Sequence, residues 1–178
     1  MSDLEELRQA AVAEESKHGR LLTKPKHGQI LSALMLPGLW LAPPSGYGVL
    51  TTTGRKTGKL RRKCIRIIRD GDRAYLVQLV PPSLGVERPG AVASWVWNLR
   101  ANPHVRLRIR GGFFDGVARE ITDGAELAHA RRVLCEPVKL FDYGECALHL
   151  RGVPSRAKIG ELHRYWFDTG HPIVVELS

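Results

Sequence analysis

Apolar and polar residues follow two different periods along this chain, and each period predicts its own kind of element. Between Val105 and Arg110 apolar residues alternate strictly with arginines, which predicts a strand with one apolar face and one arginine face. Between Ala91 and Ala101 apolar residues recur instead at the i, i+3, i+4 and i+7 spacing of a helix. The pattern predicts six strands in all: Tyr47–Thr53, Arg62–Arg69, Ala74–Val80, Val105–Arg110, Phe113–Ile121 and Ile173–Leu177.

Capping signals mark three more helices. Asp3-x-x-Glu6 is a capping box ahead of a helix that should run to about Lys17. Asp123-x-x-Glu126 and Ser155 open two later helices in the same way. The stretch Pro81–Gly90 is predicted to be a surface loop, and Glu136–Val153 has no period that assigns it.

The order of these elements indicates a fold class. Most of the predicted strands are joined by hairpin signals such as Asp70-Gly71 and Gly111-Gly112. Alternating strand–helix–strand units are absent, which argues against a doubly wound nucleotide-binding fold. The sequence therefore predicts an α+β protein with a small, mainly antiparallel barrel and peripheral helices.

The segment Ile30–Ala42 is strongly apolar and precedes the barrel. It is too short to cross a bilayer, which takes roughly 20 residues, and Pro37-Gly38 is predicted to interrupt it. We interpret it as a buried helix, with a wall of a substrate pocket or a membrane-surface contact as alternatives. It follows a basic connector, His18–His27, and ends at Pro43-Pro44-Ser45-Gly46, so we predict an N-terminal helical arm over residues 1–45 and a barrel domain over residues 46–178.

The charge balance indicates which classes of binding partner the protein favours. The chain has 27 Lys and Arg against 18 Asp and Glu, a formal net charge of +9. Such a balance favours nucleic acid, an acidic membrane surface or a polyanionic small molecule. The three cysteines form no CxxC pair, which favours a reducing, cytoplasmic setting with buried thiols.

The basic charge is concentrated in one turn, between Gly54 and Lys63. Six cations lie there without an acid, and the two glycines at Gly54 and Gly58 predict a tight hairpin turn. Backbone N–H groups in such a turn can form an anion-binding concavity. The spacing excludes a P-loop, because only three residues separate the glycines and Leu60 follows Lys59. A solvated hairpin tip is the alternative interpretation.

Other chemical signals are weak. No histidine spacing predicts a metal site, and no GxSxG elbow is present. Arg106, Arg108 and Arg110 could bind phosphate or RNA, but we favour the interpretation that they form a solvent-facing strand face. Stacking aromatics beside those cations would favour RNA, but Trp95 and Trp97 fall on a predicted helix.

Two motifs together resemble a known family. The first is Leu50-Thr51-Thr52-Thr53-Gly54-Arg55-Lys56-Thr57-Gly58, followed by Arg61 and Arg69-Asp70-Gly71-Asp72-Arg73. The second is Trp95-x-x-Asn98-Leu99-x-Ala101-Asn102-Pro103, with Pro172–Leu177 as the last strand. In this order and spacing they resemble the deazaflavin-dependent nitroreductase family of actinobacteria.

The resemblance implies a split β-barrel oxidoreductase that uses coenzyme F420, a deazaflavin with a phosphodiester and an oligoglutamate tail. Its acceptor would be a hydrophobic unsaturated, quinone-like or nitro compound. The resemblance assigns cofactor contacts to a set of residues in the turn, two strands and one helix: Arg55, Lys56, Thr57, Arg61, Arg62, Lys63, Cys64, Ile65, Arg66, Val77, Gln78, Leu79, Val80, Ser94, Trp95 and Asn98. The chain departs from the family at Leu79-Val80-Pro81-Pro82, where a Ser-Lys-Gly-Gly-type loop is usual, and at Arg66, near which an aromatic is common.

Several predictions go beyond the motifs. We name Tyr143 as a candidate proton donor, because its segment is aromatic and turn-like. FMN is the rival cofactor on the same fold, and a non-enzymatic nucleic-acid binder is the rival from another class, although we expect no nucleic acid. We also expect a cytoplasmic enzyme that packs its arm on the barrel, with a homodimer and peripheral membrane contact as open possibilities.

Overall fold

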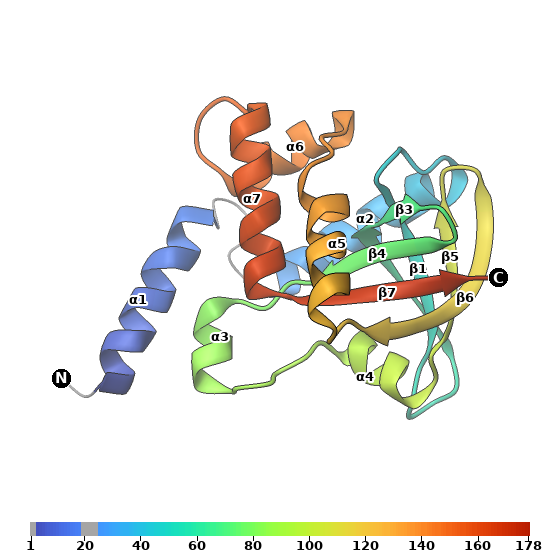
Figure 1. The fold of residues 1–178 in the computed structure, drawn as a ribbon, viewed down its shortest axis with the longest axis horizontal. Helices are drawn as coiled ribbons and strands as arrows, with labels where there is room; N and C mark the ends of the chain where they lie inside the picture. Colours follow the sequence, from blue (N-terminus) through green and yellow to red (C-terminus); the bar gives the residue numbers. More distant parts are fainter. Residues whose placement is uncertain (1–2, 19–24) are drawn as a thin grey trace.

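The computed structural model describes residues 3–18 and 25–178. Its centre is one antiparallel sheet of seven strands in the order β2-β1-β5-β6-β7-β4-β3 (Figure 1). The strands are β1 (Tyr47–Thr53), β2 (Leu60–Arg66), β3 (Ile68–Asp70), β4 (Arg73–Gln78), β5 (His104–Ile109), β6 (Gly112–Glu120) and β7 (His171–Leu177).

The two edges of this sheet are neighbours in sequence, so the sheet curls back on itself. Strands β2 and β3 lie at opposite ends of the strand order, and only Ile67 separates them. The inner face holds the main core, in which Leu50, Leu76, Leu107 and Ile173 are almost completely buried. This arrangement is the split β-barrel that the sequence predicted.

Helices cover the barrel on the outside and at one end (Figure 1). They are α1 (Asp3–His18), α2 (Pro25–Leu41), α3 (Pro82–Glu87), α4 (Ser94–Ala101), α5 (Gly124–Cys135), α6 (Leu140–His149) and α7 (Arg156–Thr169). Trp95, Val96 and Leu99 of α4 enter the inner core, whereas α5 and α7 pack on outward residues such as Tyr75 and Val174.

The arm packs on the barrel through α2, as predicted. Leu39 of α2 lies on the outward side chains of Tyr47 and Val49 from β1. Arg108 of β5 caps the C-terminal end of α2, because its guanidinium donates to the carbonyl oxygens of Trp40 and Leu41 at 2.9 and 2.8 Å. A cation at a helix C-terminus satisfies carbonyls that have no partner within the helix.

Helix α1 has different neighbours from α2. The ring of His18 stacks on Tyr165 of α7 at 3.8 Å, and Glu15 accepts a hydrogen bond from the amide of Ser83 in α3. The division of the chain at residue 45 stays a prediction. Within the described residues, no helix is both long and apolar enough to cross a membrane.

Three local predictions were wrong, and a fourth falls mostly on residues that the structure does not describe. Helix α2 continues through Pro37, since packing of its inner side on the barrel outweighs the one lost hydrogen bond. The predicted strand Arg62–Arg69 is two strands, because the chain bends at Ile67 and buries Ile67 and Ile68 in different clusters. The predicted loop Pro81–Gly90 contains α3. Most of the basic connector His18–His27 lies outside the described residues.

Candidate cofactor site

The turn between β1 and β2 is held by its own backbone. The amide of Gly54 donates to the carbonyl of Lys59 at 2.9 Å, and the amide of Gly58 donates to the carbonyl of Gly54 at 2.7 Å. Gly58 has φ of +65°, a left-handed conformation that suits glycine. The amide of Thr57 also donates to Gly54. These three amides are engaged within the turn, so they do not favour the predicted backbone concavity, and the side chains of the turn are the groups that remain for an anion.

Helix α4 anchors this turn from the opposite motif. The amide of Arg55 donates to Oδ1 of Asn98 at 3.1 Å, and Nδ2 of Asn98 donates to Oγ1 of Thr52 at 3.3 Å. Asn98 is 8% exposed, so one buried amide group fixes both the last residues of β1 and the start of the turn. The Arg55 guanidinium also lies 5.6 Å from the ring centroid of Trp97. The structure thus brings the two sequence motifs together.

The cations of the turn have no acidic partners. Arg55, Lys56, Lys59, Arg61 and Arg62 are exposed. None of them forms an ion pair with a carboxylate of residues 3–18 or 25–178. Unneutralised cations that are close together attract a multivalent anion more strongly than an isolated charge does.

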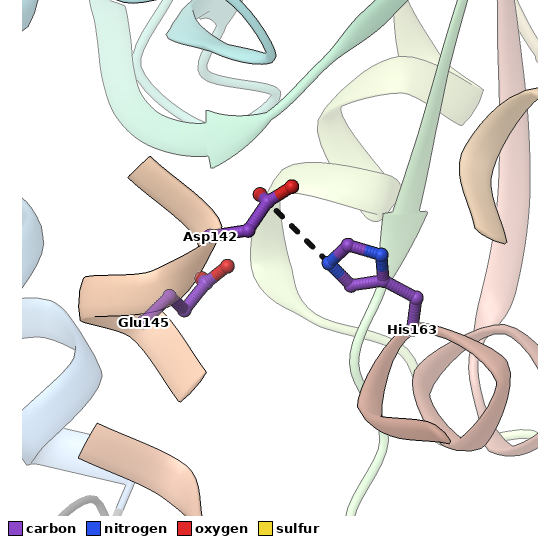
Figure 2. A group of neighbouring side chains, drawn as sticks. All are labelled: Asp142, Glu145 and His163. Carbon is purple, nitrogen blue, oxygen red and sulfur yellow. Dashed lines mark ion pairs between the residues drawn. The ribbon is translucent and has the colours of Figure 1, made fainter. Parts of the chain in front are cut away.

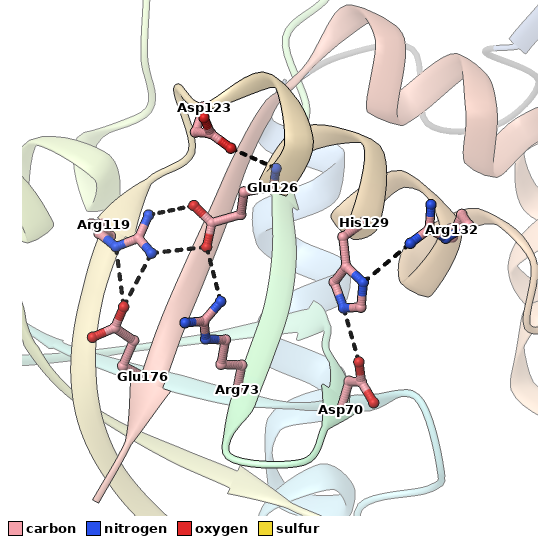
Figure 3. A network of polar contacts seen from close by, with 8 residues as sticks. All are labelled: Asp70, Arg73, Arg119, Asp123, Glu126, His129, Arg132 and Glu176. Atoms are coloured by element: carbon pink, nitrogen blue, oxygen red, sulfur yellow. Dashed lines mark hydrogen bonds and ion pairs between the residues drawn. The ribbon is translucent and has the colours of Figure 1, made fainter.

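Arginines on β6 and its neighbours are placed differently (Figure 3). Arg119 donates to Glu126 at 2.7 and 2.8 Å and to Glu176 at 3.0 Å. Arg73 shares Glu126 with it at 3.4 Å, and Asp123 caps the helix that carries Glu126. The hydrogen bonds from Arg119 lower the pKa of Glu126. The charges of these arginines are therefore compensated by carboxylates of the protein itself.

The strand period divides the predicted run Arg61–Arg66 between two faces. Lys63 pairs with Leu50 across the sheet, and directly opposed residues share a face, so Lys63 lies on the inner side of the barrel. Arg61 and Ile65 share that side, because alternate residues of a strand do. Burial lowers the pKa of Lys63. Arg61, Lys63 and Ile65 are therefore the members of the run that can face a ligand at the barrel mouth.

The other three residues of the run hold helices onto the outside of the barrel. Arg62 lies over the ring of Trp40 at 4.3 Å. The amide of Cys64 donates to Oγ of Ser32 at 2.9 Å, which satisfies a donor on the edge strand β2. Arg66 donates to the carbonyl oxygens that precede α6 and to a carboxylate of α6. Their assignment to the cofactor stays a prediction that their contacts with α2 and α6 do not favour.

The remaining predicted cofactor residues are similarly divided. Val77 points outward into the α5 and α7 cluster, whereas Gln78 shares the inner side with Leu76. Oε1 of Gln78 is buried without a hydrogen-bond partner among the described residues. Trp95 fills the inner core. Of the rest, Val80 is buried, while Leu79 and Ser94 are exposed.

Tyr143 packs between α6 and α7. It is partly buried against the cluster that contains Cys146, Ile159 and Trp166. This is the environment of a packing tyrosine, and its role as a proton donor stays a prediction. Two open hollows of about 410 and 480 Å³ lie along α1, and neither is lined by a predicted cofactor residue.

Sequence reasoning missed a buried polar group beneath α6. Asp142 and Glu145 of α6 lie beside His163 of α7 (Figure 2), and one ligand atom of each lies within 4.8 Å of the others. Arg66 binds Asp142 at 3.4 Å. Desolvation raises the pKa of Glu145 to about 8, and burial lowers the pKa of His163 to about 4. Only the Asp-x-x-Glu spacing in the unassigned segment hinted at it.

Trp97 and Thr52 were also missed as parts of the turn's support. Thr52 belongs to the quoted motif, but nothing in its sequence shows that its hydroxyl accepts from Asn98. Trp97 lies under both Arg55 and Arg100, at 5.6 and 4.7 Å. An i, i+3 spacing on α4 relates Trp97 to Arg100 and could have indicated that contact.

Comparisons with known proteins agree with this fold and these motifs. A model of the family described as F420H(2)-dependent quinone reductase matches residues 41–144, more than half of the chain. The chain therefore belongs to this family, and it is an oxidoreductase. The family resemblance stated from the two motifs is confirmed.

Solved structures are similar to this chain at low sequence identity. One described as a domain-swapped dimer is 22% identical, covers 85% of this chain and 94% of its own, and has a TM-score of 0.50. An F420-H2 dependent reductase, FDR-A, is 21% identical over 74% of this chain and 94% of its own, with a TM-score of 0.45. A 5-nitroimidazole antibiotic resistance protein from Bacteroides thetaiotaomicron is 11% identical over 82% and 79%, with a TM-score of 0.46.

Proposed function

We propose that this protein binds coenzyme F420 across the turn and the inner face of β2, and that it reduces a hydrophobic quinone-like, nitro or otherwise unsaturated acceptor. The observation that carries the proposal is the group of unpaired cations at the turn, held in place by Asn98. When bound, the reduced deazaflavin supplies a hydride. The residues of the chain bind and orient it.

The side chains present fit the parts of this cofactor. The oligoglutamate tail is a row of carboxylates, which Arg55, Lys56 and Arg61 can meet at several points. Lys63 is a half-buried cation on the inner face without a carboxylate partner in the described chain, so an anion such as the phosphodiester would compensate its desolvation. Gln78 offers a buried amide oxygen that accepts nothing else.

FMN is the second candidate cofactor. Its single phosphate would use fewer of the turn's cations than a tail with many carboxylates. A nucleic-acid binder would also use exposed cations. On the predicted arginine face, however, Arg106 is paired with Asp115 and Arg108 caps the end of α2, so two of its three arginines are engaged within the protein while Arg110 is exposed. This occupation supports a small polyanion over a nucleic acid.

The outer side of α2 supports a hydrophobic acceptor or a lipid surface nearby. Ile30, Leu34 and Leu41 fall on one stripe of the helix and are 59%, 75% and 77% exposed. Leu60 of β2, which is 65% exposed, precedes the exposed cations Arg61 and Arg62. We propose a cytoplasmic enzyme whose arm contributes to acceptor binding, with contact to an anionic membrane surface as its further role. A homodimer is the other arrangement that would cover this stripe.

Fluorescence titration with purified F420 and with FMN tests the cofactor, and turnover with a soluble quinone analogue tests the activity. We expect F420 to bind far more tightly than FMN. Binding of F420 no tighter than millimolar would refute the proposal. Cosedimentation with anionic vesicles tests the arm, and Leu34→Glu should reduce it while Lys17→Glu on α1 serves as a charge control.

A further inference from the structure

The buried group of Asp142, Glu145 and His163 joins two helices that the reductase site does not use. Asp142 and Glu145 lie three residues apart on α6, so they share a face of that helix. That face meets His163 of α7, as Figure 2 shows. The side chain of Asp142 is fully buried, and His163 is 4% exposed.

Glu145 is the member of the group without a partner. Its residue is partly exposed, but its Oε2 is completely buried and makes no hydrogen bond within the described chain. The carboxylate points toward Asp142 and His163 (Figure 2). A buried carboxylate without a compensating charge or donor is strongly unfavourable, so this position calls for a cation or a proton.

The nearby arginine does not supply that charge to Glu145. Nε of Arg66 lies 3.4 Å from Oδ1 of Asp142, and its two terminal nitrogens donate to the carbonyl oxygens of Leu134 and Pro137. These three hydrogen bonds are directed at α5, at the segment that joins α5 to α6, and at Asp142 itself. Arg66 therefore compensates the negative charge of Asp142 and does not compensate the charge of Glu145.

His163 presents a nitrogen to the same point. Its Nε2 lies 3.8 Å from Oδ1 of Asp142, whereas its Nδ1 is buried on the far side of the ring without a partner among residues 3–18 and 25–178. No hydrogen bond to Nδ1 from these residues therefore commits the ring to one tautomer. The group offers two carboxylate oxygens and one imidazole nitrogen within 4.8 Å of one another.

We propose that Asp142, Glu145 and His163 bind a divalent transition-metal ion, with zinc as the best fit, and that the ion clamps α6 to α7. Two oxygens and one nitrogen are a donor set that zinc accepts, and a water molecule would complete four-coordination. Zinc–ligand distances of about 2.0–2.2 Å place ligand atoms closer together than 4.8 Å, so the carboxylates must turn inward on binding. The ion would compensate Glu145 directly.

The site is tested on the full chain with zinc alone as the probe. After dialysis against a chelator, calorimetry should show one equivalent of Zn²⁺ bound, and the melting temperature should rise when zinc is added. Glu145→Gln keeps the shape but removes the charge. It should lose zinc binding and the rise in melting temperature, while its zinc-free form is at least as stable as the zinc-free wild type.

A matched control excludes adventitious binding to surface histidines. His129 and Asp70 form an exposed pair at 2.9 Å outside the group, so His129→Asn should leave the single equivalent unchanged. His163→Asn should abolish it. Absence of stoichiometric zinc binding by the folded wild type would overturn the proposal, and so would full binding by Glu145→Gln. Such a result would leave a protonated Glu145 as the explanation of the buried group.

Discussion

The cations of the turn and the arginines around β6 are chemically alike, yet their surroundings are opposite. Arg119 and Arg73 are neutralised by Glu126 and Glu176 in a connected network. Lys56 and Arg61 have no carboxylate partner in the part of the chain that the structure describes. A paired arginine contributes to the stability of the fold, whereas an unpaired cation held on a fixed turn remains available to an external anion. The difference shows that one region contributes to the stability of the fold, and it is the reason why we propose the other as the binding region.

The largest expected effect comes from reversing charge in the unpaired region. Lys56→Glu combined with Arg61→Glu should weaken long-tailed F420 by roughly 100-fold or more, because like charges brought together cost several kcal/mol. The melting temperature should hardly change, since neither side chain has an ion pair to lose. Fluorescence titration and thermal unfolding of the same preparation measure both. If the double variant lost stability as well as F420 affinity, the turn would also contribute to the stability of the fold, and the contrast with the paired arginines would be wrong.

A smaller loss should follow when the turn is loosened with all its cations retained. Asn98→Ala removes the acceptor for the Arg55 amide and the donor to Thr52. We expect F420 affinity to fall roughly tenfold, about 1.4 kcal/mol. Asn102→Ala is the matched control, because it removes a side chain at the end of the same helix that bonds only the His104 amide. If both variants bind alike, Asn98 does not position the turn.

In the paired region, a change of pH should alter the stability of the fold but not the affinity for F420. Arg119 lowers the pKa of Glu126 below its usual value of 4.5, so the carboxylate stabilises the fold above that pH and loses this contribution as pH falls through the lower folded-state pKa. Glu126→Gln should therefore destabilise the protein at pH 7 by up to about 1 kcal/mol. The difference should shrink below about pH 4.5, and F420 affinity should stay unchanged. Urea unfolding at several pH values measures this, and a difference that persists in acid would contradict it.

The smallest effect is expected at Tyr143. Its ring is packed against α7, so Tyr143→Phe should leave the melting temperature almost unchanged and the turnover number within about twofold of wild type, as a substitution away from special contacts does. Steady-state kinetics with a quinone analogue checks this. A large fall in turnover with unchanged cofactor affinity would instead support Tyr143 as the proton donor.

The barrel could be predicted from the sequence, because local signals determine its strands and hairpins. Turn residues such as Gly58 and Asp70-Gly71, together with the strict alternation over Val105–Arg110, specify strands and hairpins without reference to distant parts of the chain. The bend at Ile67 was missed because it depends on closure of the sheet, which is a tertiary effect.

The candidate site was predictable in part. The resemblance placed the turn and α4 in one site, and the Arg55–Asn98 bond joins them across 43 positions. Sequence could not show which cations are paired, because pairs such as Arg119 with Glu176 form between separate strands. The sequence also did not show that Arg62, Cys64 and Arg66 contact α2 and α6, because those contacts are tertiary, although the period of two places them on one face of the strand.

Binding of F420 with tails of different length tests the central claim most directly. The affinity of the wild type should increase with the number of glutamates and fall steeply with salt, since unpaired cations at the turn meet the tail carboxylates. In Lys56→Glu the dependence on tail length should largely disappear, whereas in Arg119→Gln it should be retained. Equal wild-type affinity for tailless and long-tailed cofactor would contradict the assignment of the turn to the tail.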